Sequence, residues 1–135
     1  LVVCLPDIVV STRDARKVVP EQVATRDMVE TVGSAATLTL GMCRDDPELV
    51  GRGMTEHVVT PVRAELIEGY DTAVRKAKDA GATGVTVSGA GPALLAVTNP
   101  GRQQAVGAAM IDAFASMDVE ARTFAVNIGT GATIH

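Results

Sequence analysis

A short turn between two apolar runs constrains the fold of this chain more than any other feature. Residues 84–87 and 93–97 are rich in Val, Leu and Ala, and Ser-Gly-Ala-Gly-Pro separates them at residues 88–92. Such runs with turn residues between them predict two adjacent, buried β-strands. Gly89 and Gly91 can adopt positive φ and leave the backbone uncovered, so that a ligand can reach N–H donors directly. The same pattern also fits a purely structural hairpin.

The composition fits one globular domain and argues against several functional classes. The chain has 135 residues, of which 47% are hydrophobic but only 2% aromatic, which is enough for one core built mainly from aliphatic side chains. A net charge of −4 and few aromatic rings for base stacking argue against nucleic-acid binding. No apolar run is long enough to cross a membrane, and residues 1–5 lack the basic flank of a signal peptide. We therefore expect a cytoplasmic protein that binds neither nucleic acid nor membranes, with its two cysteines reduced and in the core.

Several helices are predicted between an N-terminal strand and the hairpin. Residues 1–5 form a continuous apolar run, typical of a central strand. Helices are expected over residues 13–19, from 20 to about 43, and from 47 to 59, where Thr60-Pro61 should end the helix. A further helical stretch should follow, broken near Gly69-Tyr70, and then an amphipathic helix over residues 71–80. The second of these helices carries two apolar stripes at helical spacing, which predict more than one buried face. The stripes comprise Val29, Val32, Ala36, Leu40 and Cys43, and beside them Met28, Ala35 and Met42.

Three further elements are predicted after the hairpin. Residues 102–117 indicate a helix, residues 120–126 alternate like a strand, and a short strand is expected over 132–135. Four residues of the helix should face inward: Val106, Met110, Ala113 and Phe114. Without the helices before residue 70, the order is strand, helix, strand, strand, helix, strand. This order predicts an α+β fold, a ferredoxin-like split β-α-β sheet with a helical insertion over about residues 12–70.

Three segments together resemble one known family. A Ser-Thr-x-x-Ala-Arg pattern at residues 11–16 and a Pro-x-Arg at residues 61–63 precede the glycine turn at residues 88–92. In this order and spacing they resemble the C-terminal half of the homoserine kinase family, within the GHMP kinase superfamily. The likeness covers residues 1–97 and, more loosely, the remainder. It implies the fold of a GHMP kinase C-terminal domain, in agreement with the split β-α-β order.

The resemblance implies one half of a small-molecule kinase. Homoserine kinases transfer the γ-phosphoryl group of ATP to the hydroxyl of L-homoserine, a step of threonine biosynthesis. The chain contains neither a Gly- and Ser-rich phosphate loop at a helix start nor a P-loop motif. ATP and Mg²⁺ are therefore expected to bind mainly to an N-terminal domain that this chain lacks. We expect the isolated chain to be inactive, and its apolar face toward that domain to permit a homodimer.

The resemblance also implies the residues of the substrate site. Arg16 and Arg63 match arginines that lie at the homoserine site of the family, and a guanidinium fork suits a carboxylate. The expected phosphate and active-site loop is Ser88, Gly89, Ala90 and Gly91. No catalytic base and no metal ligand is assigned within the chain.

Thr60 and His57 lie close to the Pro-x-Arg motif. Thr60 departs from the family pattern, in which a glutamate often precedes the proline. The resemblance therefore does not define the surroundings of Arg63. His57 has no second His or Cys nearby, and we expect a partly exposed helix histidine rather than a metal ligand or general base.

Other functions fit the same features. One is another GHMP kinase with a different alcohol substrate, such as a mevalonate-pathway kinase, although an amino-acid substrate would require an arginine for its carboxylate. Another is a stand-alone ferredoxin-like domain that binds an amino acid and regulates without chemistry, which should bind tightly by itself. A third is a structural dimerisation module.

Overall fold

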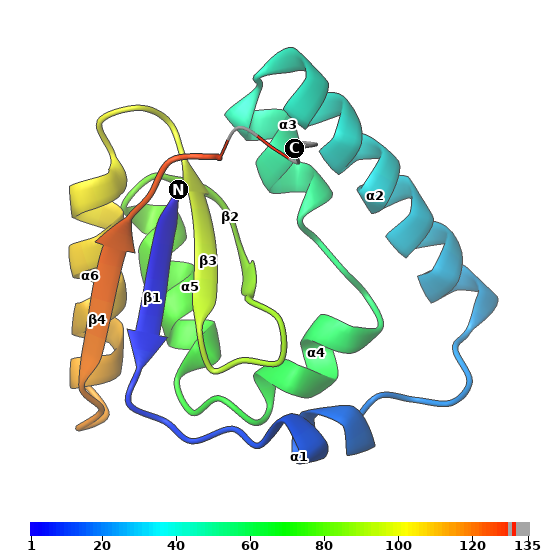
Figure 1. The fold of residues 1–135 in the computed structure, drawn as a ribbon, viewed down its shortest axis with the longest axis horizontal. Coiled ribbons are helices and arrows are strands. Elements are labelled where there is room, and N and C mark those ends of the chain that lie inside the picture. The colour runs from blue at the N-terminus through cyan, green and yellow to red at the C-terminus, as the bar shows by residue number, and fades with distance from the viewer. Residues whose placement is uncertain (130, 132–135) are drawn as a thin grey trace, which may run out of the picture.

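Four antiparallel strands form one sheet at the centre of the fold (Figure 1). The computed structural model describes residues 1–129 and residue 131, so the strand expected over residues 132–135 lies outside the described residues. The strand order is β2-β3-β1-β4, which makes the N-terminal strand a central one, as its apolar sequence predicts. The strands are β1 (Val2–Pro6), β2 (Ala82–Val87), β3 (Leu94–Thr98) and β4 (Ala121–Ala125).

Two helices cover one face of this sheet and define the fold class. Strands β1 and β2 both run antiparallel to β3, so they are parallel to each other, and α5 (Tyr70–Asp79) connects them across the face. Helix α6 (Gln103–Ala115) connects β3 to β4 on the same face, next to α5 (Figure 1). This is the ferredoxin-like split β-α-β order, so the predicted α+β fold is confirmed.

The core lies between the sheet and these two helices. Alternate residues of β1, namely Val2, Cys4 and Pro6, are buried. All four residues of α6 that the sequence places inward are fully buried: Val106, Met110, Ala113 and Phe114. Burial of a large apolar side chain contributes roughly 1.5–3 kcal/mol, so this layer is a main source of the domain's stability.

Four helices lie between β1 and α5. Ser11 caps the first, since its side chain accepts a hydrogen bond from the backbone N–H of Arg13. Asp46 caps the third through the N–H of Leu49 at 2.9 Å, and Pro47 occupies the first helical position, which suits a residue without an N–H. The helices are α1 (Thr12–Lys17), α2 (Thr25–Arg44), α3 (Pro47–Gly53) and α4 (Val59–Ala64).

The predicted start of α2 at residue 20 is wrong by five residues. Helix α2 begins at Thr25, after Ala24 in extended conformation. Pro20 follows Val18, the C-cap of α1, by two residues. Proline is common at this place because it cannot continue a helix, so Pro20 belongs to the end of α1 rather than to the start of α2.

The helix predicted over residues 47–59 is also wrong. It ends at Gly53, and after a short loop α4 begins at Val59. Pro61 therefore lies in the first turn of α4 instead of ending the preceding helix. Proline is tolerated there because the first-turn N–H groups have no partner within the helix.

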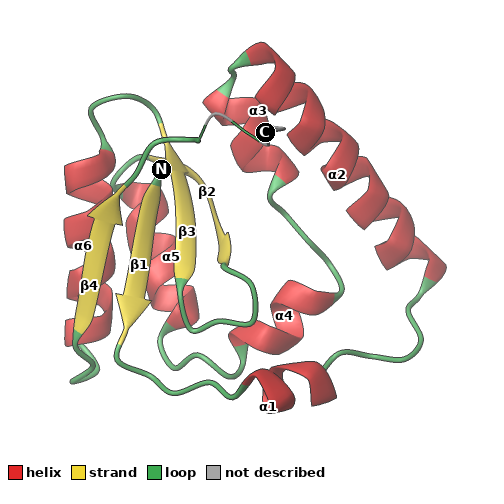
Figure 2. Cartoon of the chain, viewed as in Figure 1, coloured by secondary structure: helices red, strands yellow, loops and turns green. Residues whose placement is uncertain are grey.

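Helix α3 separates α2 from the sheet. Gly51 of α3 lies against Gly84 of β2, and Gly53 lies against Leu38 of α2. A Cβ atom at either α3 glycine would collide with backbone atoms of the facing element. The close approach of backbones thus attaches α2 to the sheet through α3, and Figure 2 shows α2 running along the outside of the molecule.

The apolar stripes of α2 are exposed, contrary to the prediction that more than one face is buried. Val29, Val32 and Met42 are each at least 60% exposed. The reason is that α2 packs chiefly against α3, so its other faces point to solvent. Cys43, expected in the core with Cys4, is exposed for the same reason. Within the described residues, no helix is both long and apolar enough to cross a membrane.

Candidate functional site

Arg63 connects the three segments that carry the sequence motifs. It lies in the last turn of α4 and is half-buried. Its Nε donates to the carbonyl oxygen of Ala15 in α1 at 3.3 Å, and its Nη1 donates to that of Gly89 at 2.8 Å. Helix α1, helix α4 and the turn between β2 and β3 are therefore held together at one end of the sheet (Figure 1).

The guanidinium of Arg63 is only partly used by these contacts. An arginine side chain carries five N–H donors in a rigid fork. Two of them make the bonds to Ala15 and Gly89, and the other three have no partner among the described residues. Two parallel N–H groups match the two oxygens of a carboxylate, so Arg63 can hold the protein segments and still bind an anion.

Arg16 directly follows Ala15, the residue that Arg63 contacts. Its side chain is exposed, and no hydrogen bond or ion pair involves it among the described residues. Ala15 itself is fully buried, which fixes the backbone of α1 at this point. The structure thus brings the backbone of Arg16 next to the Arg63 contact.

The glycine turn has the backbone conformation that its sequence predicts. Gly89 and Gly91 have φ of 62° and 83°, the left-handed region that favours glycine. The N–H of Ser88 donates to the carbonyl oxygen of Ala93 at 2.7 Å and closes the turn. A Cβ atom at Gly89 would meet no heavy atom within 4 Å, whereas one at Gly91 would lie 3.1 Å from Ile67. The turn is therefore packed at Gly91 and open at Gly89.

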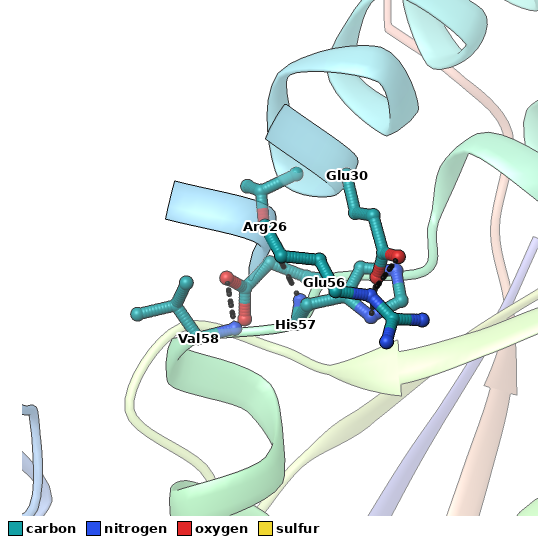
Figure 3. A network of polar contacts seen from close by, with 6 residues as sticks. Arg26, Glu30, Glu56, His57 and Val58 are labelled. Carbon is teal, nitrogen blue, oxygen red and sulfur yellow. Dashed lines mark hydrogen bonds and ion pairs between the residues drawn. The ribbon is translucent and has the colours of Figure 1, made fainter. Parts of the chain in front are cut away.

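Glu56 is the residue of this region that the sequence analysis missed. Its carboxylate accepts a hydrogen bond from the backbone N–H of Val58 at 2.8 Å (Figure 3). It accepts two more from the backbone N–H groups of Val59 at 2.6 Å and Thr60 at 2.5 Å. Burial raises the pKa of this carboxyl, but the three backbone donors outweigh it and the net pKa lies below its usual value. A signal was present: an acidic residue shortly before a first-turn proline is typical of a helix start.

A second polar network links α2 to the loop before α4. The Nδ1 of His57 lies 3.3 Å from a carboxylate oxygen of Glu30, and Arg26 donates to the other oxygen at 2.9 Å (Figure 3). The backbone N–H of His57 donates to the hydroxyl of Thr31 at 3.4 Å. His57 is partly exposed, as predicted, but it lies in a loop rather than a helix, because α3 ends earlier than expected. Over residues 1–129 and 131, no group of three or more metal-ligating side chains is found.

A cleft beside α4 is lined by Pro61 of the motif, but not by Arg63, Arg16 or the glycine turn. It has a volume of about 740 Å³ and lies between α4, α5 and β2, where Thr60, Pro61 and Ala64 of α4 and its C-cap residue Glu65 line it. At 100° per residue these four positions share one face of α4, and Arg63 lies on the opposite side. The cleft and the Arg63 contacts are therefore separate features of the same helix.

The fold and these contacts define an α+β domain of ferredoxin-like topology with a glycine turn held by an arginine at one end of the sheet. The chain belongs to the family described as GHMP kinases C terminal, whose sequence profile matches residues 38–116.

Several proteins that are similar to this chain are named homoserine kinase. The homoserine kinase of Haloquadratum walsbyi is 63% identical over 134 residues, which are 99% of this chain and 46% of that protein. The homoserine kinase of Pyrococcus furiosus is 37% identical over 98% of this chain and 44% of its own length. The crystal structure of homoserine kinase from Cytophaga hutchinsonii matches with a TM-score of 0.87 and 35% identity, over 91% of this chain and 39% of that one. The chain thus spans slightly under half the length of the curated relatives it matches.

Proposed function

We propose that this chain is the acceptor-binding half of a homoserine kinase. The complete protein transfers the γ-phosphoryl group of ATP to the side-chain hydroxyl of L-homoserine and releases ADP and O-phospho-L-homoserine. The bond between the γ-phosphorus and the bridging oxygen of ADP breaks, a bond from phosphorus to the homoserine oxygen forms, and the hydroxyl proton is released. Such a transfer depends mainly on positioning and charge neutralisation, and this chain contributes the positioning of the acceptor.

The contacts of Arg63 are the observation that carries this proposal. Its guanidinium is fixed by carbonyl oxygens of Ala15 and Gly89, and its remaining donors suit the α-carboxylate of an amino acid. Arg16, one residue beyond Ala15, supplies a second positive charge for the same group. The backbone N–H groups of Gly89 and Ala90 have no hydrogen-bond partner among the described residues, and they line the place where the hydroxyl meets the phosphoryl group.

The rest of the polypeptide supplies the nucleotide site. Since the matched relatives are about twice as long as this chain, we assign ATP and Mg²⁺ mainly to the other half. The exposed apolar residues of α2 provide surface for this half to cover. We expect the complete enzyme in the cytoplasm, where ATP is available to it.

An ADP-release assay on the complete protein tests the proposal. We expect turnover with L-homoserine and none with mevalonate, and no turnover by the 135-residue chain alone. Turnover with mevalonate but not homoserine would favour another GHMP kinase. Tight binding of homoserine or threonine by the 135-residue chain in calorimetry, without turnover by the complete protein, would favour a regulatory domain.

A further inference from the structure

The start of α4 depends on a single side chain. The first four backbone positions of a helix have no intrahelical hydrogen-bond acceptor. In α4 these are Val58, Val59, Thr60 and Pro61, and Pro61 has no N–H. All three N–H groups that remain donate to the carboxylate of Glu56.

Among the described residues, no charged side chain competes for this carboxylate. The N-cap residue of α4, Val58, offers no side-chain hydrogen bond. His57 and Arg26 are paired with Glu30 rather than with Glu56 (Figure 3). The three amides are also at the positive end of the helix, where a carboxylate is favoured. Glu56 is therefore the residue that holds the backbone of α4 at its start.

Helix α4 has only six residues and carries Arg63 near its end. A helix this short is marginal without support from outside. We propose that Glu56 is a positioning residue for the acceptor substrate: by binding the three amides it fixes α4, and thereby places the Arg63 guanidinium between Ala15 and Gly89. Glu56 acts through Arg63 and touches no reacting atom.

This inference rests on the proposed function, and kinetics of the complete protein test it. Glu56→Gln keeps the shape of the side chain but replaces one acceptor oxygen by an amino group. We expect KM for homoserine to rise about tenfold or more, with KM for ATP within about twofold of the parent. Glu56→Asp retains both oxygens on a shorter arm and should raise KM for homoserine only about threefold, since aspartate also caps helices well.

Hydrogen exchange supplies a readout that does not depend on turnover. In Glu56→Gln, the segment over residues 58–64 and the glycine turn should exchange faster, while α6 keeps its protection. The matched control is Glu68→Gln, an exposed carboxylate outside α4, which should change neither the kinetics nor the exchange. If Glu56→Gln does not fold, Glu56→Asp replaces it, and the expected result is the smaller rise of about threefold in KM for homoserine, with KM for ATP unchanged.

The outcomes separate the two proposals. A parent protein without homoserine-dependent ADP release overturns the proposed function and the substrate part of this inference. With an active parent, an unchanged KM for homoserine in Glu56→Gln, or equal changes for homoserine and ATP, overturns the positioning role alone. Faster exchange limited to α4 and the turn, together with the selective rise in KM, establishes it.

Discussion

The guanidinium Nη1 of Arg63 donates to the carbonyl oxygen of Gly89 at 2.8 Å, although 26 residues separate them in the sequence. This contact joins the helix that carries the arginine to the turn that lies open to a ligand. Because Nε of the same side chain holds Ala15, one residue sets the relative placement of all three motif segments. Substrate affinity should therefore respond to changes at either end of this bond.

Replacement of Arg63 tests its double role. In the complete protein, Arg63→Ala should lower kcat/KM for homoserine by about 100-fold, since a charge-assisted, bidentate contact is lost. Arg63→Lys should not restore it, because a single ammonium cannot span two carbonyl oxygens and a carboxylate. Initial-rate kinetics at saturating ATP measure both variants. Arg75→Ala, at an exposed arginine of α5, is the control, and a normal kcat/KM in Arg63→Ala would contradict the assignment.

The glycine turn can be tested with a pair of valine substitutions. Gly89 and Gly101 both have positive φ, 62° and 82°, and a Cβ at either would meet nothing within 4 Å. Both variants should thus fold with a similar backbone strain of about 1–3 kcal/mol. Only Gly89→Val should raise KM or abolish turnover, because Gly101 lies beyond the other end of β3. Equal kinetics of the two variants would remove the turn from the site.

Two phenylalanines test where the core ends. Phe114 is fully buried between α6 and the sheet, whereas Phe124 on β4 is 49% exposed. In the 135-residue chain, Phe114→Ala should cost about 3–5 kcal/mol, a large part of a domain's total stability. Phe124→Ala should cost under about 1 kcal/mol. Urea unfolding followed by circular dichroism compares them, and a larger loss for Phe124→Ala would refute the packing described.

The two thiols should react at very different rates. Burial raises the pKa of Cys4 to about 11, and Cys43 is exposed. At pH 8 a thiol reagent should modify one residue rapidly, Cys43, and the second only after unfolding, because the thiolate is the reactive form. Mass spectrometry of the modified chain identifies the site. Rapid loss of both thiols from the folded chain would show that β1 is not central.

Burial of the Cys4 thiol also makes the stability of the folded chain depend on pH. The pKa of Cys4 in the folded state lies above its ordinary value near 9. Its contribution to the free energy of unfolding is therefore complete below pH 9 and decreases as the pH rises toward about 11. Cys4→Ala should flatten this alkaline decrease in urea unfolding at pH 8 to 11, and an unchanged slope would count against a buried thiol.

Glu56 gives the opposite dependence at low pH. Its folded-state pKa lies below the ordinary value of 4.5, so its contribution is present above that pH and is lost as the pH falls through the folded-state pKa. Glu56→Gln should be less stable than the parent at pH 7, and the two should converge in acid. Parallel curves from pH 7 to pH 3 would contradict the capping contact.

The sheet and its two covering helices could be predicted because their residues are packed within the chain. In α6, burial on one side leaves a clear helical spacing from Val106 to Phe114, and the hairpin strands are apolar runs on either side of two glycines. The motif arginine was also recognisable, since its proline and its order relative to the turn are visible in the sequence. The hydrogen bond from Arg63 to Gly89 could not be predicted from the sequence, because it depends on how three distant segments fold against one another.

Other features could not be predicted because local signals were ambiguous. A proline such as Pro61 can mark the end of one helix or lie in the first turn of the next, and the sequence alone does not distinguish the two. The position of Glu56 indicates a helix start only once Pro61 is recognised as a first-turn proline. The prediction that the apolar stripes of α2 are buried is wrong because the helical spacing of apolar residues does not specify whether another part of the chain covers them.

The connection of residues 15, 63 and 89 through one guanidinium has a thermodynamic consequence. In the unfolded chain these positions are far apart, so the proposed site for the acceptor substrate around Arg63 does not exist there. A ligand that binds this site binds only the folded chain and therefore stabilises it. At a concentration of 100 times its dissociation constant, it would add about 2.7 kcal/mol to the free energy of unfolding. A rise in melting temperature with acceptor concentration would accordingly report occupancy without any phosphoryl transfer.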